Sequence, residues 1–323
     1  MDINELLEPF DRMLEAAVPA AVVRAIEAGE TPMPLWQDIA GSGFLDALVA
    51  EEHGGAGLSP GQIEPLIEAL GARAVPLPVA ETMVARALLA SVGIAAPQGP
   101  IVLVTSLAQA VPCALVAEHA LVDSGEELVL CAIGDLSPAP TGVAHSLAAR
   151  LSGTPEGASL PRPAAGLRAI AAVLRAALIA GAAARLCAMT TAYAAERVQF
   201  GKPIGRQQAL QQMLAIMAED MIACRIAAQI GMAQGIDVPL AVAATAKITT
   251  SAAVPRIAAS AHAVHGAIGI SEEYDLQLLT RRLHEWRMAD GSEGYWSQML
   301  GAARLAGPRT SVDWVRESVF ALA

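Results

Sequence analysis

The sequence predicts a mainly α protein, with a helical N-terminal domain, a small β domain in the middle and a C-terminal helical bundle. Two observations carry this prediction. Hydrophobic residues make up 54% of the 323 residues but aromatic residues only 3%. Alanine is therefore the largest apolar contributor, and it favours closely packed helices. Runs typical of β-strands are confined to residues 98–160, where Pro, Gly and Ser separate them.

The N-terminal domain is expected over residues 1–97, and Pro and Gly clusters divide it into separate helices. Ser59 followed by Pro60 is a typical helix start. The helical segments expected from apolar spacing are Asn4–Val23, Leu35–Leu48, Ser59–Gly71 and Glu81–Val92.

The middle domain is expected over residues 98–160 and the bundle over residues 161–323. Long helices joined by short turns are typical of an up-and-down helical bundle. The expected strands are Ile101–Val104, Cys113–Val116, His119–Val122 and Leu128–Leu130, and the expected helices are 167–196, 205–234, 238–265, 272–290 and 292–306.

Composition excludes several classes of protein. Lys and Arg number 21 against 32 Asp and Glu, a net charge of −11, which disfavours nucleic-acid binding because phosphates require a basic face. Four cysteines lie far apart without CxxC spacing, so neither a disulfide framework nor a metal site is expected. They are Cys113, Cys131, Cys187 and Cys224.

The sequence predicts no membrane span, although its mean hydropathy is +0.46. The most apolar region, Leu167–Tyr193, is interrupted by Arg168, Arg175 and Arg185. An arginine in the middle of a spanning helix costs several kcal/mol. Because Arg175 and Arg185 are about three turns apart, we expect them to share one polar edge of a buried helix. The acidic N-terminus carries no signal-peptide pattern, so a cytoplasmic location is expected.

Three motifs in the C-terminal half carry residues suited to chemistry. In the first, Arg197 and Phe200 precede a turn through Gly201 and Gly205, and Gln208 follows. The guanidinium of Arg197 is suited to an anionic group, and glutamine amides are suited to a heterocycle. The alternative is structural: an arginine that caps a helix end, followed by a turn between two bundle helices.

The second motif runs from His262 to Gly269. Glycines at 266 and 269 let backbone N–H groups approach a phosphate closely. A helix C-cap followed by a turn is the alternative. A metal site is disfavoured, because no cysteine or carboxylate lies at ligand spacing from the histidines.

The third motif is Asp290-Gly291-Ser292, at an expected junction between two helices. Ser292 is a typical N-cap. Asp290 would serve as a general base if it faced a buried cavity, and as a solvated helix cap if it did not.

Together, these motifs resemble the acyl-CoA dehydrogenase family. The Glu51-Glu52-His53-Gly54-Gly55-Ala56-Gly57 loop resembles an N-terminal loop of that family. The C-terminal matches are Arg197, Phe200, Gly201, Ile204, Gln208, His265, Gly266, Gly269, Glu273, Tyr274, Leu276, Arg281, Arg282, Asp290, Gly291 and Ser292.

The resemblance implies the family fold, an N-terminal helical domain, a middle β domain and a C-terminal four-helix bundle, with FAD between the bundle and the β domain. It implies that Arg197 contacts the FAD pyrophosphate of a neighbouring subunit, within a block that includes Phe200, and that Gln208 holds the adenosine half. The backbone at Gly266 and Gly269 would admit the neighbour's cofactor. Ser292 would bond the pyrophosphate of the chain's own FAD.

The activity implied is α,β-dehydrogenation of an acyl-CoA thioester to the 2-enoyl-CoA. Asp290 would remove the α-proton, FAD would accept the hydride, and an electron-transfer flavoprotein would take the electrons. Asp at this position, where the family has Glu, also resembles the nitroalkane-oxidase branch. The shortened middle domain resembles the smaller subunits of bacterial heteromeric acyl-CoA dehydrogenases that degrade steroids or dicarboxylates.

Two hypotheses therefore follow from the sequence. In one, the chain is an enzyme that binds FAD and supplies Asp290 as the base. In the other, it is a non-catalytic or site-completing subunit that lends Arg197 and Gln208 to a partner's FAD. In both, the expected assembly is a homo-oligomer or a heterotetramer with a homologous chain.

Overall fold

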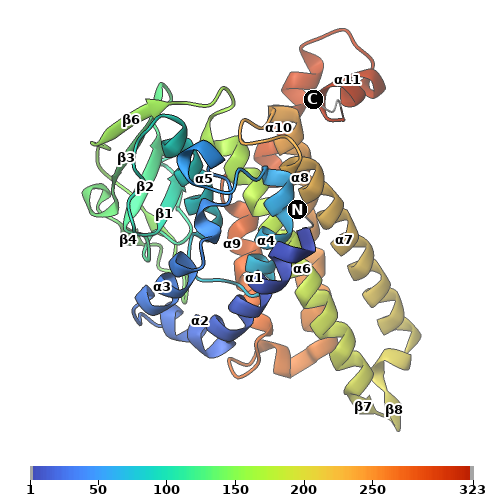
Figure 1. Cartoon of the computed structure of the whole chain (residues 1–323). Coiled ribbons are helices and arrows are strands. Elements are labelled where there is room, and N and C mark those ends of the chain that lie inside the picture. Colours follow the sequence, from blue (N-terminus) through green and yellow to red (C-terminus); the bar gives the residue numbers. More distant parts are fainter. Residues whose placement is uncertain (1–2, 321–323) are drawn as a thin grey trace.

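A computed structural model describes residues 3–320. Figure 1 shows short N-terminal helices beside a small β-sheet at the left of the view, with the long C-terminal helices toward the right. The mainly α prediction, with a small β region before a helical C-terminal half, is confirmed. The N-terminal α-helices are α1 (Ile3–Ala17), α2 (Ala20–Glu27), α3 (Met33–Gly41), α4 (Pro60–Ala72) and α5 (Val79–Ser91).

The single helix expected over Asn4–Val23 is divided into α1 and α2. Pro19 takes an extended conformation (φ −64°, ψ 154°) at the start of α2 and breaks the continuity, because proline has no N–H to donate. Ser59 starts α4 as expected: its side chain accepts from the Gln62 N–H while the Gln62 side chain accepts from the Ser59 N–H.

The main sheet has four strands in the order β1-β2-β3-β6. β1 and β2 are parallel, and the other pairs are antiparallel. The strand expected over Cys113–Val116 is wrong: this segment forms turns, and Cys113 has a φ of +58°. The strands of this region are β1 (Ile101–Val104), β2 (His119–Asp123), β3 (Glu127–Ala132), β4 (Ala139–Pro140), β5 (Ala149–Arg150) and β6 (Ala158–Pro161).

The C-terminal half contains the longest helices, and it extends away from the sheet to a small hairpin at its tip (Figure 1). Five helices match the expected segments to within four residues at each end, and the sequence analysis did not anticipate a sixth, α11. They are α6 (Gly166–Glu196), α7 (Gln208–Met232), α8 (Leu240–His265), α9 (Leu276–Met288), α10 (Glu293–Leu305) and α11 (Ser311–Ser318).

Glycines allow α4 and α6 to touch through their backbones. A Cβ added to Gly181 would lie 1.9 Å from the Glu68 carbonyl oxygen, and one added to Gly71 would lie 2.1 Å from the Leu178 carbonyl oxygen. Any side chain at either position would force the helices apart. This contact joins the N-terminal helices to the bundle.

α6 is the core helix of the molecule. Among the described residues it is the one helix long and apolar enough to cross a membrane, but most of it is buried inside the fold. The expectation that Arg175 and Arg185 share a polar edge is wrong: Arg175 is buried, 2% exposed, and Arg185 is exposed. The two ends of α6 lead to two separate candidate sites.

Candidate functional site

The predicted site residues fall into two groups at opposite ends of the bundle. Asp290 and Ser292 lie at the α9–α10 junction, whereas Arg197, Phe200 and Gln208 follow the far end of α6, near the β7–β8 hairpin. Figure 1 shows this hairpin at the tip of the molecule, remote from α10. Arg175, which contacts Asp290, precedes Arg197 on α6 by a helical distance of about 33 Å at about 1.5 Å per residue. One chain therefore does not bring both groups to one ligand.

Backbone conformation fixes the α9–α10 junction. Asp290 and Gly291 have φ values of +57° and +105°, and Ser292 then caps α10 by accepting from the Tyr295 N–H. A Cβ on Gly291 would lie 2.7 Å from the indole nitrogen of Trp296. That indole donates to the Asp290 carbonyl oxygen over 3.1 Å. The junction is thus a tight, packed corner, and Ser292 acts there as a helix cap.

The Asp290 carboxylate belongs to a buried ionic network. Its Oδ2 accepts from Arg175 Nε over 3.0 Å, and its Oδ1 accepts from Thr105 Oγ1 over 2.9 Å. The Arg175 Nη1 also donates to the Glu81 carboxylate of α5 over 2.5 Å. Asp290 is 6% exposed and Glu81 is 2% exposed. Burial acts to lower the pKa of Arg175, but the two carboxylates outweigh burial and raise that pKa above its ordinary value.

A buried lysine lies close enough to Asp290 and Arg175 for their charges to act on it. Lys247 of α8 donates to the Trp286 and Arg287 carbonyl oxygens over 2.7 and 2.8 Å, and to Ser251 Oγ over 3.0 Å. These carbonyls belong to the last turn of α9, which lacks helical partners, so the lysine fixes the end of that helix. Burial lowers the pKa of Lys247 to about 7, although the charge of Asp290 opposes this shift.

The arrangement at Asp290 limits its chemistry. A general base needs an accessible lone pair within reach of a ligand proton, whereas Asp290 is buried and its carboxylate is ion-paired with Arg175. In the described part of the chain, Asp290 lines none of five cavities found on the molecule.

The α6–α7 corner is open by contrast. Arg197 follows α6, and within residues 3–320 its side chain forms no ion pair. The short strands β7 (Val198–Gln199) and β8 (Lys202–Pro203) project from it as a hairpin. Phe200 at the hairpin turn is 93% exposed and has a φ of +53°. An exposed aromatic in a left-handed conformation is poorly explained by the isolated chain.

A cavity of about 630 Å³ lies beside Arg197, between α6, the start of α7 and the end of α8. Gln207 and Gly266 line it, but Gln208 does not. Gly266 adopts φ +63° and ψ −139°, a conformation that is essentially restricted to glycine. Gly269 is buried, and a Cβ there would lie 2.9 Å from that of His265, so packing explains this glycine.

His265 lines the same cavity, and its environment favours the neutral form. Its Nδ1 lies 2.8 Å from the Ala261 carbonyl oxygen, its ring stacks on Tyr193 with centroids 4.4 Å apart, and burial lowers its pKa. His262 instead contacts Thr280 Oγ1. No group of three metal-ligating side chains gathers anywhere in residues 3–320.

The sequence analysis missed Glu81 and Lys247. A signal for Glu81 existed, because an arginine such as Arg175 within a long apolar helix requires a carboxylate partner when buried. Little in the local sequence marks Lys247, because two of its three hydrogen-bond partners lie 39 and 40 residues away on another helix.

Comparisons with known proteins place the chain in a family. Residues 169–305 match the family model described as "Acyl-CoA dehydrogenase, C-terminal domain". The chain is 31% identical to acyl-CoA dehydrogenase IpdE2 of Mycolicibacterium smegmatis over 302 residues, which are 90% of each chain. It is 33% identical to IpdE2 of Mycobacterium tuberculosis over 282 residues, covering 83% of this chain and 85% of that protein.

Solved structures share the fold at low identity. The ChsE4–ChsE5 complex from Mycobacterium tuberculosis contains a chain of TM-score 0.77 and 22% identity, covering 96% of this chain and 99% of that one. The Tcur3481–Tcur3483 steroid ACAD gives a TM-score of 0.78 at 22% identity, covering 95% and 99%. Together with the IpdE2 identities, these findings show that the chain belongs to the acyl-CoA dehydrogenase family.

Proposed function

We propose that this chain is a site-completing subunit of a heteromeric, FAD-dependent acyl-CoA dehydrogenase. The assembly would oxidise an acyl-CoA thioester to its 2-enoyl-CoA, pass electrons to an electron-transfer flavoprotein and act in the cytoplasm. The carrying observation is the contrast between an Asp290 carboxylate that is buried and ion-paired with Arg175 and an Arg197 guanidinium that has no carboxylate partner among the described residues.

The α6–α7 corner fits part of a dinucleotide. Arg197 offers a guanidinium suited to a pyrophosphate, and Gly266 lets backbone approach closely in a conformation other residues avoid. Bound FAD would supply the hydride acceptor. This chain's own residues would hold one end of the cofactor, with Gln207 rather than Gln208 lining the cavity.

The partner's identity is proposed by analogy. Among the solved structures of this fold, one is the ChsE4–ChsE5 complex and another is the Tcur3481–Tcur3483 steroid ACAD. We extend this to the present chain: a homologous chain supplies the catalytic base, and the acyl group is of the steroid-degradation type. The exposed Phe200 on the hairpin is available to pack on that chain.

A second candidate keeps Asp290 as the base, in a dehydrogenase or a nitroalkane-oxidising flavoenzyme. One observation favours it: Asp290 lies in a buried helix junction, where a carboxylate released from Arg175 would be shielded from water. Catalysis would then require the Arg175–Asp290 pair to open.

Purification alone and together with a homologous dehydrogenase chain, followed by flavin quantitation, tests the main proposal. We expect little FAD in the isolated chain and a heteromer that retains it. In the heteromer, Asp290→Asn should leave anaerobic flavin reduction by an acyl-CoA within about threefold of wild type, since loss of a general base would cost about 10²–10⁴-fold. A loss of that size, or full flavin occupancy in the isolated chain, would instead support the second candidate.

A further inference from the structure

Two glutamates lie one turn apart on the face of α4 that meets α7. Glu64 is 4% exposed, and the Glu68 side chain is 16% exposed. Residues four apart in a helix are neighbours on its surface, and like charges at that spacing repel each other. Burial strengthens the repulsion, because little water is present to screen it. Two carboxylates at these positions are therefore unfavourable unless a cation or a proton accompanies them.

The positive charge beside this pair is small. Arg225 of α7 is the cation that acts on both carboxyl groups. Its Nε lies 3.8 Å from Glu68 Oε2, beyond hydrogen-bonding distance, and its side chain is 58% exposed. The Oε1 atoms of Glu64 and Glu68 are buried and receive no hydrogen bond from the described residues.

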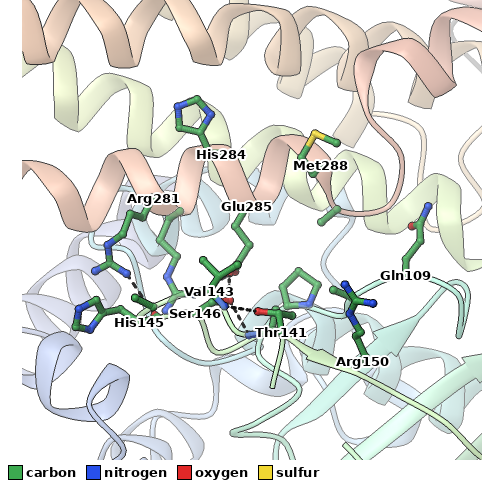
Figure 2. A pocket seen from close by; sticks show the side chains of 16 residues that line it. Gln109, Thr141, Val143, His145, Ser146, Arg150, Arg281, His284, Glu285 and Met288 are labelled. Carbon is green, nitrogen blue, oxygen red and sulfur yellow. Dashed lines mark hydrogen bonds and ion pairs between the residues drawn. The ribbon is translucent and has the colours of Figure 1, made fainter. Parts of the chain in front are cut away.

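Glu285 shows how the same fold neutralises another carboxylate that is largely buried. It lies in a groove between α9 and residues 139–150, where Figure 2 shows it beside Ser146. Ser146 Oγ donates to Glu285 over 2.7 Å, and Arg282 donates to it over 3.1 Å. Glu285 thus has a hydroxyl and a guanidinium as donors, whereas within residues 3–320 the two Oε1 atoms on α4 have neither.

Other charged groups on the elements packed against α4 are engaged elsewhere. Asp11 of α1 pairs with Arg73 over 2.9 Å. On α6, Arg175 belongs to the buried ionic network, and Arg185 lines a cavity beside the end of α4. On α7, Asp220 pairs with an arginine of α8. A proton is therefore the remaining means of neutralising the pair.

α4 cannot relieve the repulsion by shifting along its neighbours. Its backbone touches α6 at the Glu68 carbonyl oxygen, and at its start a Cβ on Gly61 would lie 3.5 Å from the Ala233 Cα at the end of α7. The two carboxyl groups are held within hydrogen-bonding reach of each other. A single proton between them converts the repulsion into a charge-assisted hydrogen bond.

We propose that Glu64 and Glu68 share one proton, and that its loss loosens α4 from α7. In the protonated state, Glu64 donates to the Glu68 carboxylate. When the proton leaves to water, two carboxylates face each other beside one exposed arginine, and water must enter between α4 and α7 to solvate them. This inference goes beyond the proposed function and does not rest on it, because it uses neither Arg197 nor Asp290.

The direction of the pKa shifts agrees with a shared proton. Burial, and then the charge of Glu68, raise the pKa of Glu64 from 4.5 to about 8. Burial also raises the pKa of Glu68, whereas the hydrogen bond from Glu64 and the charge of Arg225 oppose that rise. Between pH 4.5 and 8 the folded chain therefore binds more protons than the unfolded chain, so its stability falls as the pH rises through this window.

Glu64→Gln tests the shared proton, because its amide keeps the size of the side chain and donates to Glu68 as the protonated acid does. Urea denaturation at pH 5.5, 6.5 and 7.5 compares the variant with wild type. The ratio of the wild-type unfolding constant to that of the variant should rise with pH, by up to about tenfold per pH unit. Glu219→Gln, which removes an exposed carboxylate from α7, should give a curve parallel to wild type. Parallel curves for Glu64→Gln and wild type would overturn the proposal.

Two further measurements examine the proton and the loosening separately. Infrared spectra at pH 6.5 should contain the carbonyl-stretch band of a buried carboxylic acid in wild type and lack it in Glu64→Gln. Amide hydrogen exchange, compared at the same pH so that intrinsic rates cancel, should become faster in α4 of wild type than in α4 of the variant as the pH rises from 7 to 9, and stay equal in α9. A wild-type spectrum without the acid band contradicts the shared proton, and equal exchange in α4 contradicts the loosening.

Discussion

The α9–α10 junction and the α6–α7 corner differ in whether their charged side chains are buried and paired with one another. At the junction, Asp290, Arg175 and Lys247 are buried, and every one of them has hydrogen-bond partners. At the corner, Arg197 is exposed beside a cavity and has no ion pair among residues 3–320. Groups that satisfy one another hold a structure together, whereas unsatisfied groups are available to a ligand or a partner.

This difference reverses the functional roles that the sequence suggests for the two motifs. The Asp-Gly-Ser motif suggested the reactive centre, yet its carboxylate is a partner of a buried arginine. The Arg197 motif suggested an accessory contact, yet it carries the chain's better-formed binding feature. The predictions below test this contrast, beginning with the largest expected effect.

Removing the central cation should strongly destabilise the junction. Arg175→Met leaves Glu81 and Asp290 buried without their cation, so the free energy of unfolding should fall by about 3–5 kcal/mol. Arg206→Met, at an exposed position, should change it by less than about 0.5 kcal/mol. Urea denaturation measures both. If Arg175→Met lost no more than the control, the network would contribute nothing to folding, and Asp290 would be free to react.

Removing the exposed cation at the α6–α7 corner should weaken FAD binding and leave folding intact. Arg197→Ala should weaken FAD retention by the heteromer about tenfold or more, because charge-assisted bonds contribute about 1.5–3 kcal/mol. Its flavin-free melting temperature should match wild type, because the side chain is exposed. Flavin-to-protein ratios after dialysis and a thermal melt provide the two measurements. A large drop in the melting temperature would identify Arg197 as a structural helix cap.

Lys247 should make the junction sensitive to pH. Its folded-state pKa of about 7 lies below its ordinary value of 10.5, so between these values the unfolded chain binds more protons than the folded one. Its contribution to the free energy of unfolding therefore rises with pH across this window, by at most about 1.4 kcal/mol per pH unit, and is lost as pH falls through 7.

Lys247→Met should remove that slope while filling similar volume. Urea denaturation of wild type and variant at pH 7.5, 8.5 and 9.5 gives the comparison directly. Parallel stability curves for the two proteins would show that Lys247 stays charged through its three hydrogen bonds, and that its burial carries no titration penalty.

The smallest effect is expected at Phe200. Phe200→Gly relieves a φ of +53° and removes an exposed ring, so the isolated chain should lose no stability and gain at most about 1 kcal/mol. Assembly with a homologous chain should weaken if the ring packs on it. Sedimentation of the mixture at several concentrations compares the two proteins, and unchanged assembly would remove Phe200 from the interface.

Much of the fold was predictable because helical periodicity is local. The segments of α6 to α10 followed from apolar spacing, and the Ser59 start followed from capping chemistry. The break at Pro19 was visible in the sequence but was outweighed by the apolar pattern on either side. The turn at Cys113–Val116 was not predictable from its residues, because four apolar residues there read equally well as a strand.

The site was less predictable because its geometry is set by contacts distant in sequence. Glu81, Arg175 and Asp290 are separated by 94 and 115 residues, and only folding brings them together. The motif match located Asp290 but contained no information about Arg175, whose side chain forms an ion pair with the Asp290 carboxylate. Adjacent residues were similarly indistinguishable: Gln207 lines the cavity, and Gln208 faces solvent.

The backbone contact between α4 and α6 fixes the spacing between these two helices. Gly181 follows Arg175 on α6 by six residues, about 9 Å along the helix axis, so the spacing of the two helices is set close to the buried ionic network. A single methyl group at Gly181 would push the two helices apart and displace Arg175 relative to Glu81 and Asp290. Gly181, which has no side chain, thereby determines the alignment of the buried ionic network.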